Sequence, residues 1–119
     1  MATQIKATEA RDSAVISDRP SFLYDMQVIS NNASDERYLM LFDATAVPAD
    51  GAVPVWRAVV PAEQHISISF IGNDHANFGG ANFKNGIVAA LSSTKATLTV
   101  TSSSEAYFQA HFNPRPGRS

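Results

Sequence analysis

The feature that most constrains this chain is a two-residue alternation of apolar and polar side chains, clearest between positions 65 and 70. In the run HISISF every second residue is apolar, so Ile66, Ile68 and Phe70 share one face of an extended strand. A helix would spread the same side chains around its surface and leave no dry side. The pattern therefore predicts a strand with one face toward a core and the other toward water.

Two further strands are predicted just before this one. The segment 37–42 has apolar side chains on both faces, which indicates a strand in the middle of the assembly, covered on each side. The segment 53–60 contains Pro54, which lacks a backbone N–H and favours a strand start or an unpaired edge. The connection 61–64 is short enough to join antiparallel neighbours.

The same reasoning predicts four more strands, at residues 21–31, 86–91, 96–101 and 106–112. In the first, the set expected to point inward is Phe22, Tyr24, Met26 and Val28. In the third, Leu98 and Val100 are expected to point inward. The apolar run 86–91 fits a strand buried on both sides or a buried helical turn, and its β-rich neighbourhood favours the strand.

Seven or eight strands joined by short turns, with no long helix, predict an all-β fold. We expect a single antiparallel β-sandwich with jelly-roll or Greek-key-like connections, and an immunoglobulin-like sandwich is the alternative.

The composition of the chain excludes several kinds of binding site and partner. The chain has 119 residues, the size of one domain, and no cysteine, so it holds no disulfide framework and no thiolate metal site. A net charge of −2 gives no electrostatic reason to expect nucleic acid or an anionic membrane as a partner. The first residues lack the apolar core of a signal peptide, so we expect a soluble protein made in the cytoplasm.

The predicted organisation has three parts: a polar N-terminal arm at 1–20, a sandwich domain at 21–113 and a flexible C-terminal tail at 114–119. The arm and the tail are candidate contacts with neighbouring subunits, and the residues proposed for this role are Ile5, Val15, Ile16, Arg115 and Arg118. The alternative for the arm is a partly ordered terminus.

The most unusual stretch is the long loop that follows Phe70, since it combines aromatic rings with asparagines. Stacking rings and amides suit a sugar platform or a docking patch. The candidate partner or glycan contacts are Asn73, Asn77, Phe78, Asn82 and Phe83. In the alternative interpretation one or both phenylalanines fold back and plug the open end of the sandwich.

No motif indicates catalysis. His65, His75 and His111 lack the close spacing of metal ligands, and no serine lies in a G-x-S-x-G elbow. We therefore predict no catalytic residue, no cofactor and no metal, and do not expect an enzyme. A hydrolase would need a cleft lined by histidine and acidic residues.

A resemblance is carried by strand and turn segments between residues 21 and 100: the segment 23–28, RYLMLFD at 37–43, PV at 54–55, VVPA at 59–62, Phe83, and GIV at 86–88. In this pattern the chain resembles small β-sandwich virion proteins of tailed bacteriophages. The resemblance implies a structural role without chemistry, often in homotrimers.

From this resemblance we expect a capsid decoration (cement) protein that stabilises the shell by binding across capsomers. Its partners would be copies of itself, with a trimer favoured, and the major capsid protein or other virion proteins. Its location would be the virion, after synthesis in the host cytoplasm. The alternative is a phage tail or fibre component, or a module that recognises a glycan on the host surface.

Overall fold

The computed structural model describes residues 4–9, 11–30, 32, 34–70, 81–101 and 105–114. These residues form nine strands and no helix: β1 Gln4–Ala7, β2 Ser13–Ser17, β3 Ser21–Ser30, β4 Arg37–Phe42, β5 Trp56–Val60, β6 His65–Ser69, β7 Ala81–Phe83, β8 Ile87–Ser92 and β9 Ala106–Pro114. The all-β prediction is confirmed, with nine strands in place of seven or eight.

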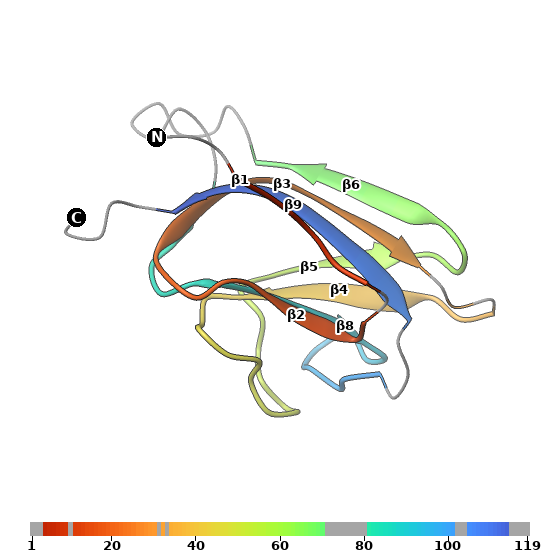
Figure 1. The fold of residues 1–119 in the computed structure, drawn as a ribbon. Coiled ribbons are helices and arrows are strands. Elements are labelled where there is room, and N and C mark those ends of the chain that lie inside the picture. Colours follow the sequence, from red (N-terminus) through yellow and green to blue (C-terminus); the bar gives the residue numbers. More distant parts are fainter. Residues whose placement is uncertain are drawn as a thin grey trace.

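The strands form two antiparallel sheets that pack face to face (Figure 1). Sheet A has the order β1-β9-β3-β6, with β7 also paired to β3, and sheet B has the order β2-β8-β4-β5. Most of the buried apolar side chains, among them Leu23, Leu41 and Phe108, form one main core cluster between the sheets. The structure is therefore the predicted antiparallel sandwich.

The connections are those of a jelly roll. When the short β7 is left aside, β1 pairs with β9, β2 with β8, β3 with β6 and β4 with β5, so the pairs are nested one inside the next. This nested pairing is that of one long hairpin folded over on itself, which is the jelly-roll arrangement. The jelly-roll expectation is thus confirmed over the immunoglobulin-like alternative.

Sheet B is covered on both of its faces. Leu39 and Leu41 of β4 point into the main core, whereas Met40 and Phe42 belong to a second core on the other side of the sheet. This confirms the prediction that 37–42 is a central strand covered on both sides. The continuous apolar run of β8 is buried for the same reason.

Two loops, 43–55 and 93–101, cover the second core and lie below sheet B in Figure 1. They are bonded to each other: the Gly51 N–H donates to the Leu98 carbonyl at 2.7 Å, and the Leu98 N–H donates to the Ala52 carbonyl at 2.9 Å. The segment 96–101 is therefore not the strand expected from its alternation. Leu98 nevertheless points inward, with 1% of its surface exposed.

The N-terminal residues belong to the sandwich rather than to an arm. β1 pairs with β9 at the edge of sheet A, and β2 pairs with β8 at the edge of sheet B. Ile16, expected to contact a neighbouring subunit, lies in the main core, and Val15 packs against the second core. Burial of this short apolar run explains why the segment joins the sheets.

A bulge in β3 changes which side chains point inward. Leu23 is opposite Phe112 of β9 and Asp25 is opposite His111, so Tyr24 is the extra residue on the bulged strand. Met26 and Val28 are buried as predicted, but Phe22 and Tyr24 are only partly buried, and Leu23 takes the inward position instead.

The connection 61–64 joins different sheets and not antiparallel neighbours. β5 lies at the edge of sheet B and β6 at the edge of sheet A. Within this corner Glu63 has φ of 56°, and its N–H donates to the Asn32 carbonyl at 2.9 Å. The short turn expected from sequence is present, but it makes the crossing between layers.

Candidate functional site

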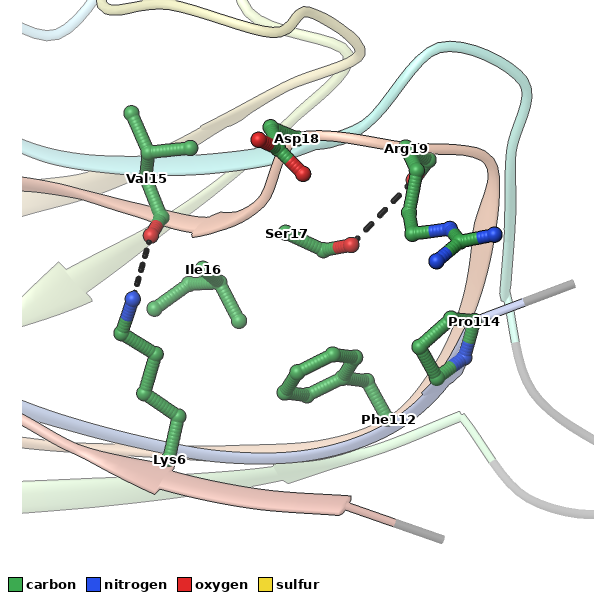
Figure 2. Close-up of a pocket in the computed structure, with 8 residues that line it drawn as sticks. All are labelled: Lys6, Val15, Ile16, Ser17, Asp18, Arg19, Phe112 and Pro114. Atoms are coloured by element: carbon green, nitrogen blue, oxygen red, sulfur yellow. Dashed lines mark hydrogen bonds between the residues drawn. The ribbon is translucent and has the colours of Figure 1, made fainter. Parts of the chain in front are cut away.

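A pocket of about 420 Å³ lies where β1 and β2, the edge strands of the two sheets, face each other (Figure 2). It is lined by Lys6, Val15, Ile16, Ser17, Asp18, Arg19, Phe112 and Pro114. Lys6 comes from β1, the next three residues from β2, Asp18 and Arg19 from the turn before β3, and the last two from β9. Three other pockets in the described part of the chain measure about 190, 180 and 160 Å³.

Two serines fix the main chain of the turn at this pocket. The Oγ atoms of Ser17 and Ser21 lie 2.8 Å apart, and both are within hydrogen-bond distance of the Arg19 carbonyl oxygen, at 3.2 and 2.9 Å. Both serines are buried, so these bonds are protected from water. The Arg19 backbone is therefore anchored while its side chain stays exposed at the rim.

The pocket combines an apolar floor with a rim that carries two cations, Lys6 and Arg19, and one carboxylate, Asp18. The Lys6 Nζ donates to the Val15 carbonyl at 2.9 Å and so covers a polar group on the free edge of β2. Ile16 and Phe112 are almost fully buried at the floor. Among the described residues the ion pairs involve only Arg37 and His111, so neither Lys6 nor Arg19 has a carboxylate within 4 Å. The arrangement can hold an anionic group attached to an apolar body.

The outer face of sheet A is a second candidate site. It carries the residues Ile5, Ala7, Asp25, Gln27, Ile29, His65, Ser67, Ser69, Tyr107, Gln109 and His111, and we call this set the open face. All eleven are exposed or only partly buried, in contrast to Met40, Phe42, Val88 and Ala90 on the outer face of sheet B beneath its two loops. Three of them are large apolar side chains in water: Ile5, Ile29 and Tyr107 are 70%, 40% and 39% exposed.

The strand registers order the open face into rows. One row contains Asp25 opposite His111, the next Gln27 opposite Gln109, and the third Ile29 opposite Tyr107. The His111 Nδ1 lies 2.7 Å from the Asp25 Oδ1, which pairs the one carboxylate of the face with a histidine. The open face carries no Lys, Arg or Glu, and depletion of charged residues is typical of the buried centre of protein interfaces.

A third site is a small aromatic pocket of about 180 Å³ lined by Asp43, Val55, Trp56, Phe70, Ala81, Asn82 and Phe83. The rings of Trp56 and Phe70 meet edge to face, with centroids 5.5 Å apart. Asp43 is occupied within the chain, since its carboxylate accepts the N–H groups of Lys84 at 3.1 Å and Asn85 at 2.7 Å. The pocket therefore presents ring edges beside the exposed residue Asn82.

The residues expected from sequence to bind a partner have different positions. Asn82 is exposed in β7, whereas Phe83 is 4% exposed in the main core and has no free ring face for stacking. Ile5 is exposed on the open face. Asn73, Asn77, Phe78, Arg115 and Arg118 lie outside the described residues.

Titratable groups add little to these sites. In the described part of the chain, no group of three or more His, Cys, Asp or Glu side chains is placed to hold a metal ion, and no helix is long and apolar enough to cross a membrane. The pKa of Tyr38 is raised above its usual value of 10.0 by desolvation, by the hydrogen bond to Glu36 and by the charge of that carboxylate. Tyr38 lies on sheet B and lines none of the three sites.

Sequence reasoning missed the residues that matter most here. The outward-pointing sets of β3 and β9 could be read from alternation, but their pairing into rows depends on register and on the bulge. Lys6 and Arg19 gave no signal, because single cations in a polar terminus are ordinary. They line one pocket because β1 of sheet A lies beside β2 of sheet B and the turn that follows it.

Comparisons of the chain with protein-family models, with curated proteins and with solved structures find no match. A function must therefore be argued from the chain's own surfaces.

Proposed function

We propose that this protein is a non-enzymatic structural protein of a phage virion, most specifically a capsid decoration (cement) protein that stabilises the shell by binding across capsomers. The phage origin rests on the strand and turn resemblance described above. The attachment role rests on the structure, and the observation that carries it is the open face of sheet A.

The open face has the character of a contact surface. Sheets normally bury one face, and the central strands β4 and β8 of sheet B are buried on both because two loops cover their outside, although Val59 of the edge strand β5 is 46% exposed. Sheet A has exposed isoleucines and a tyrosine where a polar, charged surface would favour solubility. A flat, weakly charged area with amides and one aromatic ring fits a protein partner better than it fits a small substrate, which needs a concave site.

The fold agrees with this role without deciding it. Jelly rolls occur in viral capsid proteins and also in lectins, and fold alone does not specify function. The role implies a homo-oligomer, for which the resemblance favours a trimer, and the major capsid protein as the second partner. Many weak contacts repeated over a shell would then act together by avidity.

The pocket in Figure 2 is a second attachment point in this proposal. An acidic segment of a shell protein would place a carboxylate at Lys6 or Arg19, away from Asp18, and an apolar side chain over Phe112. Substitution of both cations by glutamine would then weaken shell binding, whereas Lys95→Gln, exposed in the loop below sheet B, would not.

The test is a cryo-microscopy reconstruction of particles whose genome encodes this chain, made with and without it. We expect density for the jelly roll on the outer shell lattice and lower thermal stability of particles that lack it. Density confined to the tail, or none on the particle, would contradict decoration of the capsid.

A second function, recognition of a host-surface glycan from the tail or fibre, is favoured by one observation. The aromatic pocket places Trp56, Phe70 and the exposed Asn82 together, and edge-accessible rings beside an amide are suited to a sugar. A glycan array tests this function. Binding that is lost in Asn82→Ala and kept in the open-face variant Gln109→Ala would support the glycan role over the structural one.

A further inference from the structure

We propose that the partner of the open face is a second copy of this chain, related to the first by a two-fold axis that runs parallel to the strands between β9 and β3. The inference rests on the proposed function only in taking the open face as an attachment surface; with that face covered by a second copy, contact with the shell is made through the other attachment point, the pocket in Figure 2. It adds the identity of the partner and the geometry of the contact.

The strand registers define which residues such an axis brings together. A rotation of 180° about it places β9 of the second copy over β3 of the first and leaves every row at the same height. His111 then faces Asp25 of the second copy, Gln109 faces Gln27, and Tyr107 faces Ile29. Each contact occurs twice, which is the condition for an isologous interface.

The chemistry of the facing rows is complementary. Within each chain Asp25 and His111 lie 2.7 Å apart, and across the interface this pair faces the same pair of the second copy. Each carboxylate therefore has one imidazole beside it in its own chain and a second one opposite it in the other copy. In the middle row, amide faces amide, and each amide can both donate and accept. In the third row, an aromatic ring faces an aliphatic side chain, and both are exposed in the single chain.

The other two-fold axis within the plane of the face fits less well. An axis perpendicular to the strands through the glutamine row would place Asp25 and His111 over Ile29 and Tyr107 of the second copy. A carboxylate would then lose water against apolar side chains without a new partner, which is unfavourable. The parallel axis is therefore the arrangement that the residues specify.

The area of the open face indicates how strongly two copies should associate. Four strands about 4.8 Å apart and five residues of about 3.4 Å each give roughly 300 Å². A stable interface buries about 800 Å² per partner. The pairing is therefore weak for the free chain and becomes important at the high local concentration of a shell, where attached copies hold each other in place.

Sedimentation equilibrium of the full chain, at concentrations up to the millimolar range, tests the pairing. We expect a reversible monomer–dimer equilibrium that is weakened roughly tenfold or more in the double variant Gln27→Lys, Gln109→Lys, because four like charges would meet. The control variant Ser93→Lys, Ala96→Lys adds the same charge in the loop below sheet B and should leave the equilibrium unchanged. A monomer at every concentration, or a trimer unaffected by the first variant, would overturn the inference.

A mixing experiment distinguishes loss of pairing between folded chains from misfolding of the variants. The double variant Gln27→Glu, Gln109→Glu should also be monomeric alone, yet an equal mixture with the lysine variant should form heterodimers. Failure of the mixture to associate, while both variants keep the circular dichroism and melting behaviour of the parent, would count against a self-facing contact.

Crosslinking identifies the axis. The chain has no cysteine, so one introduced thiol is unique, and packed sheets lie about 10 Å apart, too far for a disulfide but within reach of a short bismaleimide. Around the parallel axis Ile29→Cys and Gln27→Cys should both crosslink as dimers, and Ser93→Cys should not. Around the perpendicular axis the two copies of position 29 are displaced by about 14 Å along the strands, so crosslinking of Gln27→Cys alone would overturn the parallel axis.

These outcomes are separate from those for the proposed function. A chain that pairs in solution yet is absent from the particle would refute decoration and leave the dimer standing. A chain that occupies the shell as isolated monomers would refute the dimer and leave decoration standing.

Discussion

At the scale of single residues, Glu105 joins the two sheets. Its carboxylate accepts the Arg37 Nε–H at 2.9 Å and the Asn32 Nδ2–H at 3.1 Å. Arg37 begins β4 of sheet B, and Glu105 directly precedes β9 of sheet A. The Arg37 and Glu105 side chains are only 18% and 12% exposed, so this ion pair is shielded from water.

We expect Glu105→Gln to lower the free energy of unfolding by about 1–3 kcal/mol, because it leaves a mostly buried guanidinium with a weaker partner. Asp35→Asn is the matched control, since Asp35 lies 3.8 Å from the same arginine but is 62% exposed. That change should cost about 0.5 kcal/mol or less. Urea denaturation measures both, and equal losses in the free energy of unfolding would show that the buried ion pair stabilises the fold no more than the exposed one.

Gly86 is a position where a larger side chain cannot fit. A Cβ there would lie 2.5 Å from the Ala44 carbonyl oxygen and 2.6 Å from that of Ser17, and both are backbone atoms. Gly86→Ala should therefore destabilise the fold by about 1–3 kcal/mol. Thermal melting should show a clear decrease, against little change for the exposed neighbour in Asn85→Ala.

Tyr38 gives a pH prediction. Its pKa is raised by desolvation and by Glu36, so the folded chain keeps the phenol proton at a pH where the unfolded chain releases it. Stability should accordingly fall as pH rises from the unfolded pKa, near 10.0, toward the higher folded value. Absorbance titration should show Glu36→Gln lowering the Tyr38 pKa, and an unchanged titration would contradict the contribution assigned to Glu36 beside that of desolvation.

At the scale of elements, the loops 43–55 and 93–101 behave as part of the core. They close over Met40, Phe42 and Val88 of sheet B, and Leu98 is the loop residue buried among them. Their mutual backbone bonds replace the sheet bonds that a strand at 96–101 would have made.

Leu98→Ala tests this cover. We expect a loss of about 2–4 kcal/mol, the cost of a cavity at a fully buried leucine, although the residue lies in a loop. Val53→Ala, in the other loop and 69% exposed, should change stability by about 0.5 kcal/mol or less. A small effect at Leu98 would mean that the loops are dispensable.

The alternation of apolar and polar side chains predicted the strands well, because within a single strand it shows which face is buried and which is exposed. It located β4, β6 and β8 and the inward position of Leu98. It failed at Tyr24, where the extra residue of a bulge reverses the faces and leaves no mark in the pattern. It also failed at 61–64, because a short turn looks the same whether it joins neighbours in one sheet or crosses between two.

The candidate sites were less predictable for a related reason. Aromatic and amide residues suggested a binding loop, yet Phe83 is buried in the core and only Asn82 is exposed. The open face and the pocket of Figure 2 combine residues from strands distant in sequence, such as Lys6 with Phe112. Their composition is a property of register and sheet order, which a single sequence does not display.

At the scale of the whole molecule, the two sheets differ in what covers them. Sheet B is enclosed by the main core and the second core, while sheet A presents the open face to its surroundings. A two-sided molecule of this kind is suited to lie flat against something, with its loop-covered side outward. We therefore infer that the open face is covered by a partner in the assembled particle.

Thiol labelling within the particle tests that claim most directly. In particles assembled with Gln109→Cys, a maleimide reagent should react much more slowly than with the dilute free chain, whereas Ser93→Cys should react equally fast in both. Equal reactivity of Gln109→Cys in the particle and in the free chain would contradict the account.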